Sequence, residues 1–298
     1  MRTMSWFKKL LYAVTLPLGA LFFSSGGLAA DSPWQKSFGE VEALKFREAD
    51  RRIAYGDEAS QFIDLWLPRG KTTESRPVVV LIHGGCWLEQ YDISHVRPLA
   101  TALADRGFAV WAVEYRRVGE TGGGWTGTFQ DISAAVDRLK ELGHPAMQKR
   151  RAVFIGHSAG GHLALWAAGR SRLEQGRELY REDPFVPVGA VGLAAITDLK
   201  EYAGGNSSCQ RVAPQLMGGT PAQFPGRYDQ ASPAVLGADV PVVLLQGGAD
   251  GIVPPAQAQA FAGAEVVLLE EAGHFDLIHT RTPAFPKLVE VLRELFAQ

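Results

Sequence analysis

The sequence lacks the features of several classes of protein. It has only two cysteines, and no Cys/His spacing is typical of a metal site. The net charge is −2 and the basic residues form no stripe or cluster, which argues against nucleic-acid binding. With 46% hydrophobic and 21% charged residues, the composition is that of a globular protein rather than a disordered, collagen-like or multi-spanning chain. We therefore expect a single globular domain with a large core.

The first thirty residues have the pattern of a secretory signal peptide. Basic residues precede an apolar run at 10–23, and small residues end the segment at Ala30. A membrane anchor is the weaker interpretation, because the run is shorter than the roughly 20 residues that cross a bilayer. We expect residues 1–30 to be cleaved. The remaining domain, 31–298, would then be periplasmic or secreted, with no stable membrane insertion.

Export bears on the state of the two cysteines, Cys86 and Cys209. Disulfides persist in oxidising compartments, so one bridge is consistent with the sequence. It would close a loop of 209 − 86 = 123 positions, for which the chain-entropy model gives roughly 4–5 kcal/mol of stabilisation. Two separate buried thiols are equally consistent with the sequence, and both states stay open.

Apolar runs alternate with amphipathic segments along the rest of the chain. Continuous apolar runs predict strands buried on both faces, and helical spacing of apolar residues predicts helices that cover them. We predict strands at 61–68, 76–82, 108–115, 151–155, 188–196, 241–246 and 265–269, and helices at 94–106, 128–143, 161–169 and 284–298. This alternation predicts an α/β fold with a mostly parallel central sheet and helices on both faces. Residues 197–235 lack periodicity, and we expect a small cap insertion there.

Three chemically useful residues follow three of the predicted strands. They are Ser158, Asp250 and His274, at the edge where open α/β sheets bind ligands. Ser158 lies in a G-x-S-x-G motif between a strand and a helix, and the order Ser…Asp…His is that of a nucleophile-elbow hydrolase. We predict that Ser158 is the nucleophile, that His274 takes its proton, and that Asp250 orients the imidazole.

A negatively charged intermediate would need backbone donors beside the serine. The amide of Ala159, at the start of the predicted helix, is one candidate. The second would come from Gly85 or Cys86 in the turn after strand 76–82, and the sequence does not choose between them. We expect three residues to support this turn: His83 through a hydrogen bond, Gly84 by allowing close approach, and Trp87 as either a pocket wall or part of the core.

Other acids and histidines compete for these roles. Asp198 is the rival acid, but it is better explained as a turn or helix-capping residue. His279 is the rival base, and it lies five residues after His274, in a helix or loop. Of the two histidines that flank the serine, we expect His157 to support the elbow and His162 to pack within the helix.

Four segments carry a family resemblance: HGGCW at 83–87, GHSAGG at 156–161, GGADGIVP at 247–254 and AGHFDLI at 272–278. They resemble the α/β-hydrolase superfamily. The HGG motif, with VEYRR at 113–117 and ASPAV at 231–235, resembles its esterase/lipase branch, close to kynurenine formamidase-like and feruloyl-esterase-like serine hydrolases. The resemblance implies the α/β-hydrolase fold and a cofactor-free serine hydrolase that cleaves carboxylic esters through an acyl-enzyme.

Three functions fit this resemblance to different degrees. The signal peptide favours a small-molecule ester outside the cytoplasm over intracellular cleavage of a formyl group. An amidase or formamidase of the kynurenine formamidase type is the alternative enzyme, because it uses the same catalytic residues. A non-catalytic binding protein on the same fold would lack a member of the Ser-Asp-His set, and none is missing.

Overall fold

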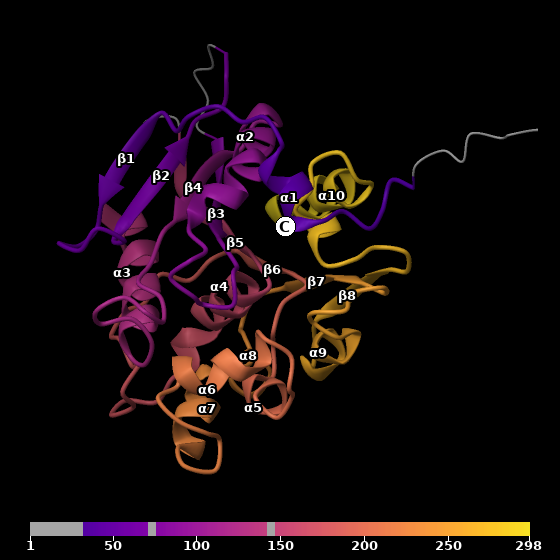
Figure 1. Cartoon of the computed structure of the whole chain (residues 1–298). Helices are drawn as coiled ribbons and strands as arrows, with labels where there is room; N and C mark the ends of the chain where they lie inside the picture. The colour runs from indigo at the N-terminus through magenta and orange to yellow at the C-terminus, as the bar shows by residue number, and fades with distance from the viewer. Residues whose placement is uncertain (1–31, 71–75, 142–146) are drawn as a thin grey trace, which may run out of the picture. The chain divides into compact units, whose positions relative to one another are not determined.

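The structure is a computed structural model that describes residues 32–70, 76–141 and 147–298. The predicted signal peptide, 1–30, lies outside the described residues. Contacts divide the chain into Met1–Ser32, of which only Ser32 is described, and Pro33–Gln298, which is built around an eight-stranded sheet (Figure 1). Within the described ranges, no helix combines the length and apolarity needed to cross a bilayer.

The sheet is mostly parallel, as the sequence predicts. Its strands run in the order β1-β2-β4-β3-β5-β6-β7-β8. β2 is antiparallel to both of its neighbours, and every other neighbouring pair from β4 to β8 is parallel. The strands are Arg51–Ala54 (β1), Phe62–Trp66 (β2), Arg76–Ile82 (β3), Ala109–Val113 (β4), Met147–His157 (β5), Gly189–Leu193 (β6), Val242–Gly247 (β7) and Glu265–Leu269 (β8).

The central strands are apolar throughout because both faces of the sheet are covered. In β3, Val78 and Val80 point into one core cluster, and Val79 and Leu81 point into the other. All four side chains are fully buried. A strand covered on one face only would alternate between apolar and polar residues, so the continuous run reports the two-sided burial.

Helices cover both faces of the sheet (Figure 1). α2 (Arg97–Asp105) and α10 (Ala284–Ala297) contribute to one core cluster. α3 (Gly127–Glu141) and α4 (Ala159–Gly169) contribute to the other. Every residue of α4 is buried, because further short helices pack over it.

Those short helices come from the segment 197–235. They are α5 (Leu199–Tyr202), α6 (Ala213–Leu216) and α7 (Pro225–Ala231), followed by α8 (Pro233–Leu236). They lie on the α4 side of the sheet (Figure 1). Helices this short have little stability alone, and contacts with the rest of the fold stabilise them.

Some elements of the structure begin at other residues than the sequence predicts, and some were not predicted at all. The helix expected at 94–106 begins at Arg97, after a 3₁₀ turn at Ile93–Val96, and it keeps proline in its first turn. β1 reads Arg-Arg-Ile-Ala and is largely exposed at the sheet edge. Two further helices, α1 (Phe38–Glu42) and α9 (Pro255–Ala260), also lack an apolar period.

Candidate active site

Ser158 lies at a sharp turn between β5 and α4. Its backbone angles are φ 56° and ψ −119°, a region that side chains rarely occupy, and the residue is buried. The turn is possible only because the flanking glycines let the backbone approach closely. A Cβ at Gly160 would lie 2.2 Å from the carbonyl oxygen of Ile82, and one at Gly156 would lie 2.1 Å from that of Gly160. The glycines of the G-x-S-x-G motif are therefore steric requirements of the elbow.

Ser158 and His274 line the same cavity, which has a volume of about 210 Å³. Gly85 and Cys86 line it as well. The cavity lies at the carboxyl edge of the parallel strands, where the sequence predicts the site. Across the part of the chain that the structure describes, no group of three or more His, Cys, Asp or Glu residues is placed to hold a metal ion.

The structure brings Asp250 and His274 into direct contact. Nδ1 of His274 lies 2.7 Å from Oδ2 of Asp250, and the carboxylate is fully buried. Its other oxygen accepts hydrogen bonds from the amides of Ile252, at 2.8 Å, and Val253, at 2.9 Å. The carboxylate is fixed from both sides, so it holds the imidazole with Nε2 as the nitrogen left for the cavity. The rival acid, Asp198, caps α5 as expected.

His157 holds the loop that carries His274. Its Nε2 lies 3.0 Å from the backbone oxygen of His274, and the two rings are 4.5 Å apart. Burial, together with the neighbouring His274, holds the pKa of His157 well below its usual range, so the ring is neutral and donates from Nε2. The sequence predicts support of the elbow, and the structure shows a bond from the elbow to the histidine loop.

The turn after β3 has an unusual backbone. Gly85, Cys86 and Trp87 have φ values of 101°, 52° and 58°, and two of the three are not glycine. Two side-chain interactions hold it. Cys86 forms a disulfide with Cys209, and Nε1 of Trp87 donates to Nδ1 of His162 at 3.2 Å. The sequence leaves open whether the two cysteines are bridged, and the structure shows the disulfide. The sequence also leaves Trp87 as either a pocket wall or part of the core, and the structure buries it in the core.

This turn lies beside the start of α4, because a Cβ at Gly84 would be 3.3 Å from the Cβ of Ser158. Gly85 and Cys86 line the cavity with Ser158, and Ala159 is the first residue of the helix. The amide of a first helical residue has no acceptor within its own helix. The amides predicted to stabilise a negative charge thus belong to segments that meet at the cavity.

His162 links the turn to the segment 197–235. It accepts from Trp87 at Nδ1 and donates from Nε2 to the backbone oxygen of Ala231 at 2.8 Å. Burial lowers its pKa to about 4. The neutral ring satisfies both contacts, whereas a second proton would face the Trp87 N–H.

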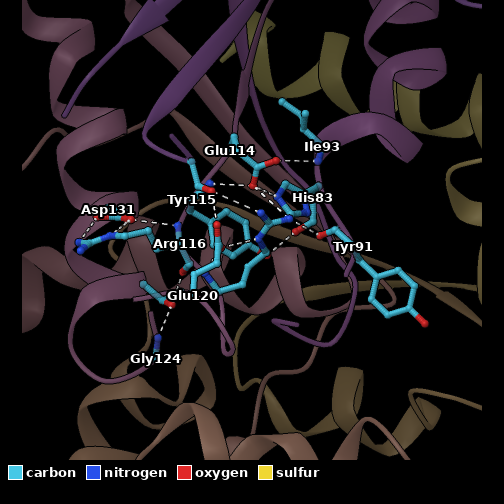
Figure 2. Close-up of polar contacts among 12 residues, drawn as sticks. His83, Tyr91, Ile93, Glu114, Tyr115, Arg116, Glu120, Gly124 and Asp131 are labelled. Atoms are coloured by element: carbon cyan, nitrogen blue, oxygen red, sulfur yellow. Dashed lines mark hydrogen bonds and ion pairs between the residues drawn. The ribbon is translucent and has the colours of Figure 1, made fainter. Parts of the chain in front are cut away.

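Glu114, at the end of β4, holds the other side of the turn through a buried network (Figure 2). Its carboxylate lies 2.8 Å from Nε2 of His83 and accepts from the amides of Ile93, at 2.9 Å, and Tyr115, at 3.0 Å. Arg117 approaches it to 3.6 Å. Burial alone would raise the pKa of Glu114, but the interactions with His83 and Arg117 and the amide bonds outweigh burial and lower it.

His83 connects this network to the turn at residues 84–87, which is the candidate oxyanion turn. Its Nδ1 lies 2.9 Å from the carbonyl oxygen of Gly84, and its ring stacks on Tyr115 with centroids 4.4 Å apart. The Tyr115 hydroxyl donates to the His83 carbonyl oxygen at 2.9 Å. The sequence predicts a structural His83, and this geometry agrees. Glu114 was not predicted, although a carboxylate ending an apolar strand signals a buried partner.

Comparison with known proteins identifies a matching family model and several similar proteins. The family model described as BD-FAE matches residues 63–264. Esterase LipC of Mycobacterium tuberculosis is 26% identical over 247 residues, which cover 76% of this chain and 60% of that protein. The isoprenylcysteine alpha-carbonyl methylesterase ICME of Arabidopsis thaliana is 26% identical over 259 residues, covering 78% of this chain and 57% of that protein. The chain thus spans about 60% of the length of these curated relatives.

Solved structures share the architecture at low identity. Esterase B from Lactobacillus rhamnosis has a TM-score of 0.71 at 23% identity, covering 85% of this chain and 88% of that one. A truncated carbohydrate esterase from gut microbiota has a TM-score of 0.71 at 19% identity, covering 86% of this chain and 99% of that one. These likenesses concern the arrangement of helices and strands.

Proposed function

The chain belongs to the BD-FAE family and has the α/β-hydrolase fold, and from this premise we propose that it is a serine hydrolase of carboxylic esters. The names of its relatives, Esterase LipC and a methylesterase, support an ester substrate. One observation carries the proposal. Ser158 and His274 line one cavity with Gly85 and Cys86, while Nδ1 of His274 lies 2.7 Å from Asp250.

The first half of the proposed reaction acylates the enzyme. The Ser158 oxygen attacks the carbonyl carbon, and Nε2 of His274 takes the hydroxyl proton. Asp250 fixes the imidazole tautomer and stabilises the imidazolium. The amides of Ala159 and of Gly85 or Cys86 donate to the negatively charged oxygen. When the intermediate collapses, His274 returns the proton to the departing alcohol oxygen, and an acyl-enzyme remains.

The second half releases the acid. Water loses a proton to Nε2 of His274 and attacks the acyl carbonyl carbon. The same amides stabilise the second intermediate. The C–O bond to Ser158 then breaks and its oxygen regains the proton, so the net reaction consumes one ester and one water and gives an alcohol and an acid. We assign the substrate as a small-molecule ester, and no step calls for a cofactor.

We also propose that the protein acts outside the cytoplasm, in the periplasm or as a secreted enzyme. The disulfide between Cys86 and Cys209 supports this location, because cytosolic thiols are kept reduced. The pattern of residues 1–30 supports it independently. A formamidase remains the alternative activity, since its chemistry would use the same three side chains.

Ser158→Ala tests the proposal. Hydrolysis of p-nitrophenyl acetate should fall by about 10⁴- to 10⁶-fold with the circular dichroism spectrum unchanged. Ser208→Ala is the matched control, because Ser208 lines the same cavity and has no assigned role. Wild-type turnover by Ser158→Ala would refute the assignment. A kcat/KM for N-formylkynurenine far above that for short esters would favour the formamidase instead.

A further inference from the structure

We propose that Phe38 sets the size of the group that the active-site cavity accepts, and that Asp276 holds it there. This inference rests on the proposed function and adds a specificity-determining residue to it. Phe38 lies on α1, in a segment far from the nucleophile in sequence, and it lines the same cavity as Ser158 and His274.

Phe38 completes an aromatic wall of the cavity. The centroid of its ring lies 5.7 Å from that of Tyr91, 5.5 Å from that of His95 and 5.5 Å from that of Phe275. All four residues line the cavity. Phe275 directly follows His274, so this wall begins beside the imidazole. Phe38 packs edge to face on Tyr91 and at a tilt of 56° on both His95 and Phe275, so it contacts three rings of the wall at once.

The segment that carries Phe38 is fixed by one buried carboxylate. Asp276 is fully buried, and it accepts hydrogen bonds from the amides of Gln35, at 2.7 Å, and Lys36, at 2.9 Å. It also accepts from the amide of Gly273 at 2.6 Å. Gly273 and Asp276 flank His274, so the same carboxylate holds both the N-terminal segment and the histidine loop.

Two further interactions fix the segment locally. The side chain of Gln35 donates to the backbone oxygen of Glu271 at 2.8 Å. Ser37 and Glu40 form a capping box at the start of α1, in which each side chain accepts from the other's amide. Phe38 is the first residue of that helix, so the cap fixes its backbone next to the anchor on Asp276.

The volume of the cavity implies a size limit. The cavity has a volume of about 210 Å³. Pockets that enclose drug-sized ligands are larger, about 300–1,000 Å³. The cavity therefore suits one small group of an ester, either a short acyl chain or a small alcohol. Phe38 comes from a segment separate from the elbow and from the turn at residues 84–87, so its side chain can be changed without substituting a residue of either.

The test compares two series of esters on the purified full chain. One varies the acyl group from acetate to octanoate in p-nitrophenyl esters, and the other varies the alcohol in acetate esters. Phe38→Ala should raise kcat/KM for the long members relative to the short ones by about tenfold or more in at least one series. Phe38→Trp should shift the preference toward the short members, which keeps the test decisive if the alanine variant folds poorly.

Asp276→Asn tests the anchor. It should relax the size preference in the same direction as Phe38→Ala, a change that a general loss of stability would not produce. Phe46→Ala is the matched control, because Phe46 is 41% exposed and outside the cavity lining, and its size profile should equal that of the wild type. An unchanged size preference in both Phe38 variants would overturn the inference. If Ser158→Ala is inactive at the same time, the proposed function still stands.

Discussion

A disulfide joins Cys86, in the turn after β3, to Cys209, in the segment between β6 and β7. Both residues line the candidate active-site cavity with Ser158 and His274. The bridge therefore links a candidate donor of the oxyanion turn to the helices of residues 197–235. It also closes a loop of 123 positions in the chain.

Cys209→Ser should weaken both stability and catalysis. The loss of so long a loop closure should lower the free energy of unfolding by about 2–5 kcal/mol. The Cys86 amide should lose its fixed position, and kcat should fall by about tenfold to a hundredfold if that amide contacts the oxyanion. Urea unfolding and ester hydrolysis measure the two effects. Ser208→Ala should leave both unchanged, and full kcat in Cys209→Ser would argue against a role for the bridge in the site.

Asp250→Asn should lower kcat by about 10³- to 10⁴-fold with little change in KM. The asparagine amide can replace the carboxylate in size. Its oxygen would accept from the Ile252 and Val253 amides, so its NH2 group would donate to Nδ1 of His274 and favour the wrong tautomer. Asp198→Asn is the control, because asparagine caps a helix as well as aspartate does, so this change should leave both kcat and stability nearly unchanged. Steady-state kinetics on short esters distinguish the two. The reverse pattern, with only Asp198→Asn inactive, would exchange their roles.

The elements predicted correctly from sequence are those whose burial produces a recognisable pattern of apolar residues within the element itself. β3 and β7 are covered on both faces, and both appear in the chain as unbroken apolar runs. β1 and the short helices of residues 197–235 carry no such run. They form because neighbouring parts of the fold provide packing partners. The spacing of apolar residues within these segments does not indicate those partners.

The same distinction applies to the site. Ser158, Asp250 and His274 could be proposed from the sequence because each follows a recognisable strand, and parallel strands bring their ends to one edge. Phe38 and Asp276 could not be predicted in this way, and the position of Glu114 after β4 did not identify its partner. Glu114 meets His83 across 31 positions and Asp276 meets Gln35 across 241, so their roles depend on contacts that only the fold creates. The Ser37–Glu40 capping box was a readable signal for α1.

Glu114→Gln should reduce activity more than it reduces folding. The neutral amide cannot satisfy His83 and two backbone amides together, so the oxyanion turn should shift, and kcat should fall by about tenfold or more. Asp64→Asn is the matched control, because it removes a buried carboxylate that pairs with Arg52 away from the cavity. Activity is measured at a temperature where both variants are folded. Equal kcat in the two variants would show that Glu114 serves stability alone.

The protein should lose stability as the pH falls from about 6.5 toward 4. Burial, together with the nearby His83, lowers the pKa of His95 to about 3, and burial lowers that of His162 to about 4, from an ordinary value of 6.5. Between these values the unfolded chain binds protons that the folded chain does not, so acid favours unfolding. Each histidine should contribute about 1.4 kcal/mol per pH unit in this window, and nothing above it.

Urea titrations at a series of pH values measure this slope directly. His95→Asn should lower the slope of the unfolding free energy against pH by about 1.4 kcal/mol per pH unit, because asparagine does not titrate. His279→Asn serves as the comparison, since His279 has a smaller lowering of its pKa and lies outside the cavity lining. A wild-type stability that is flat between pH 6.5 and 4 would mean that the buried histidines accept protons in the folded state. In that case the neutral His162 between Trp87 and Ala231 would be wrong, together with the hydrogen-bond directions drawn from it.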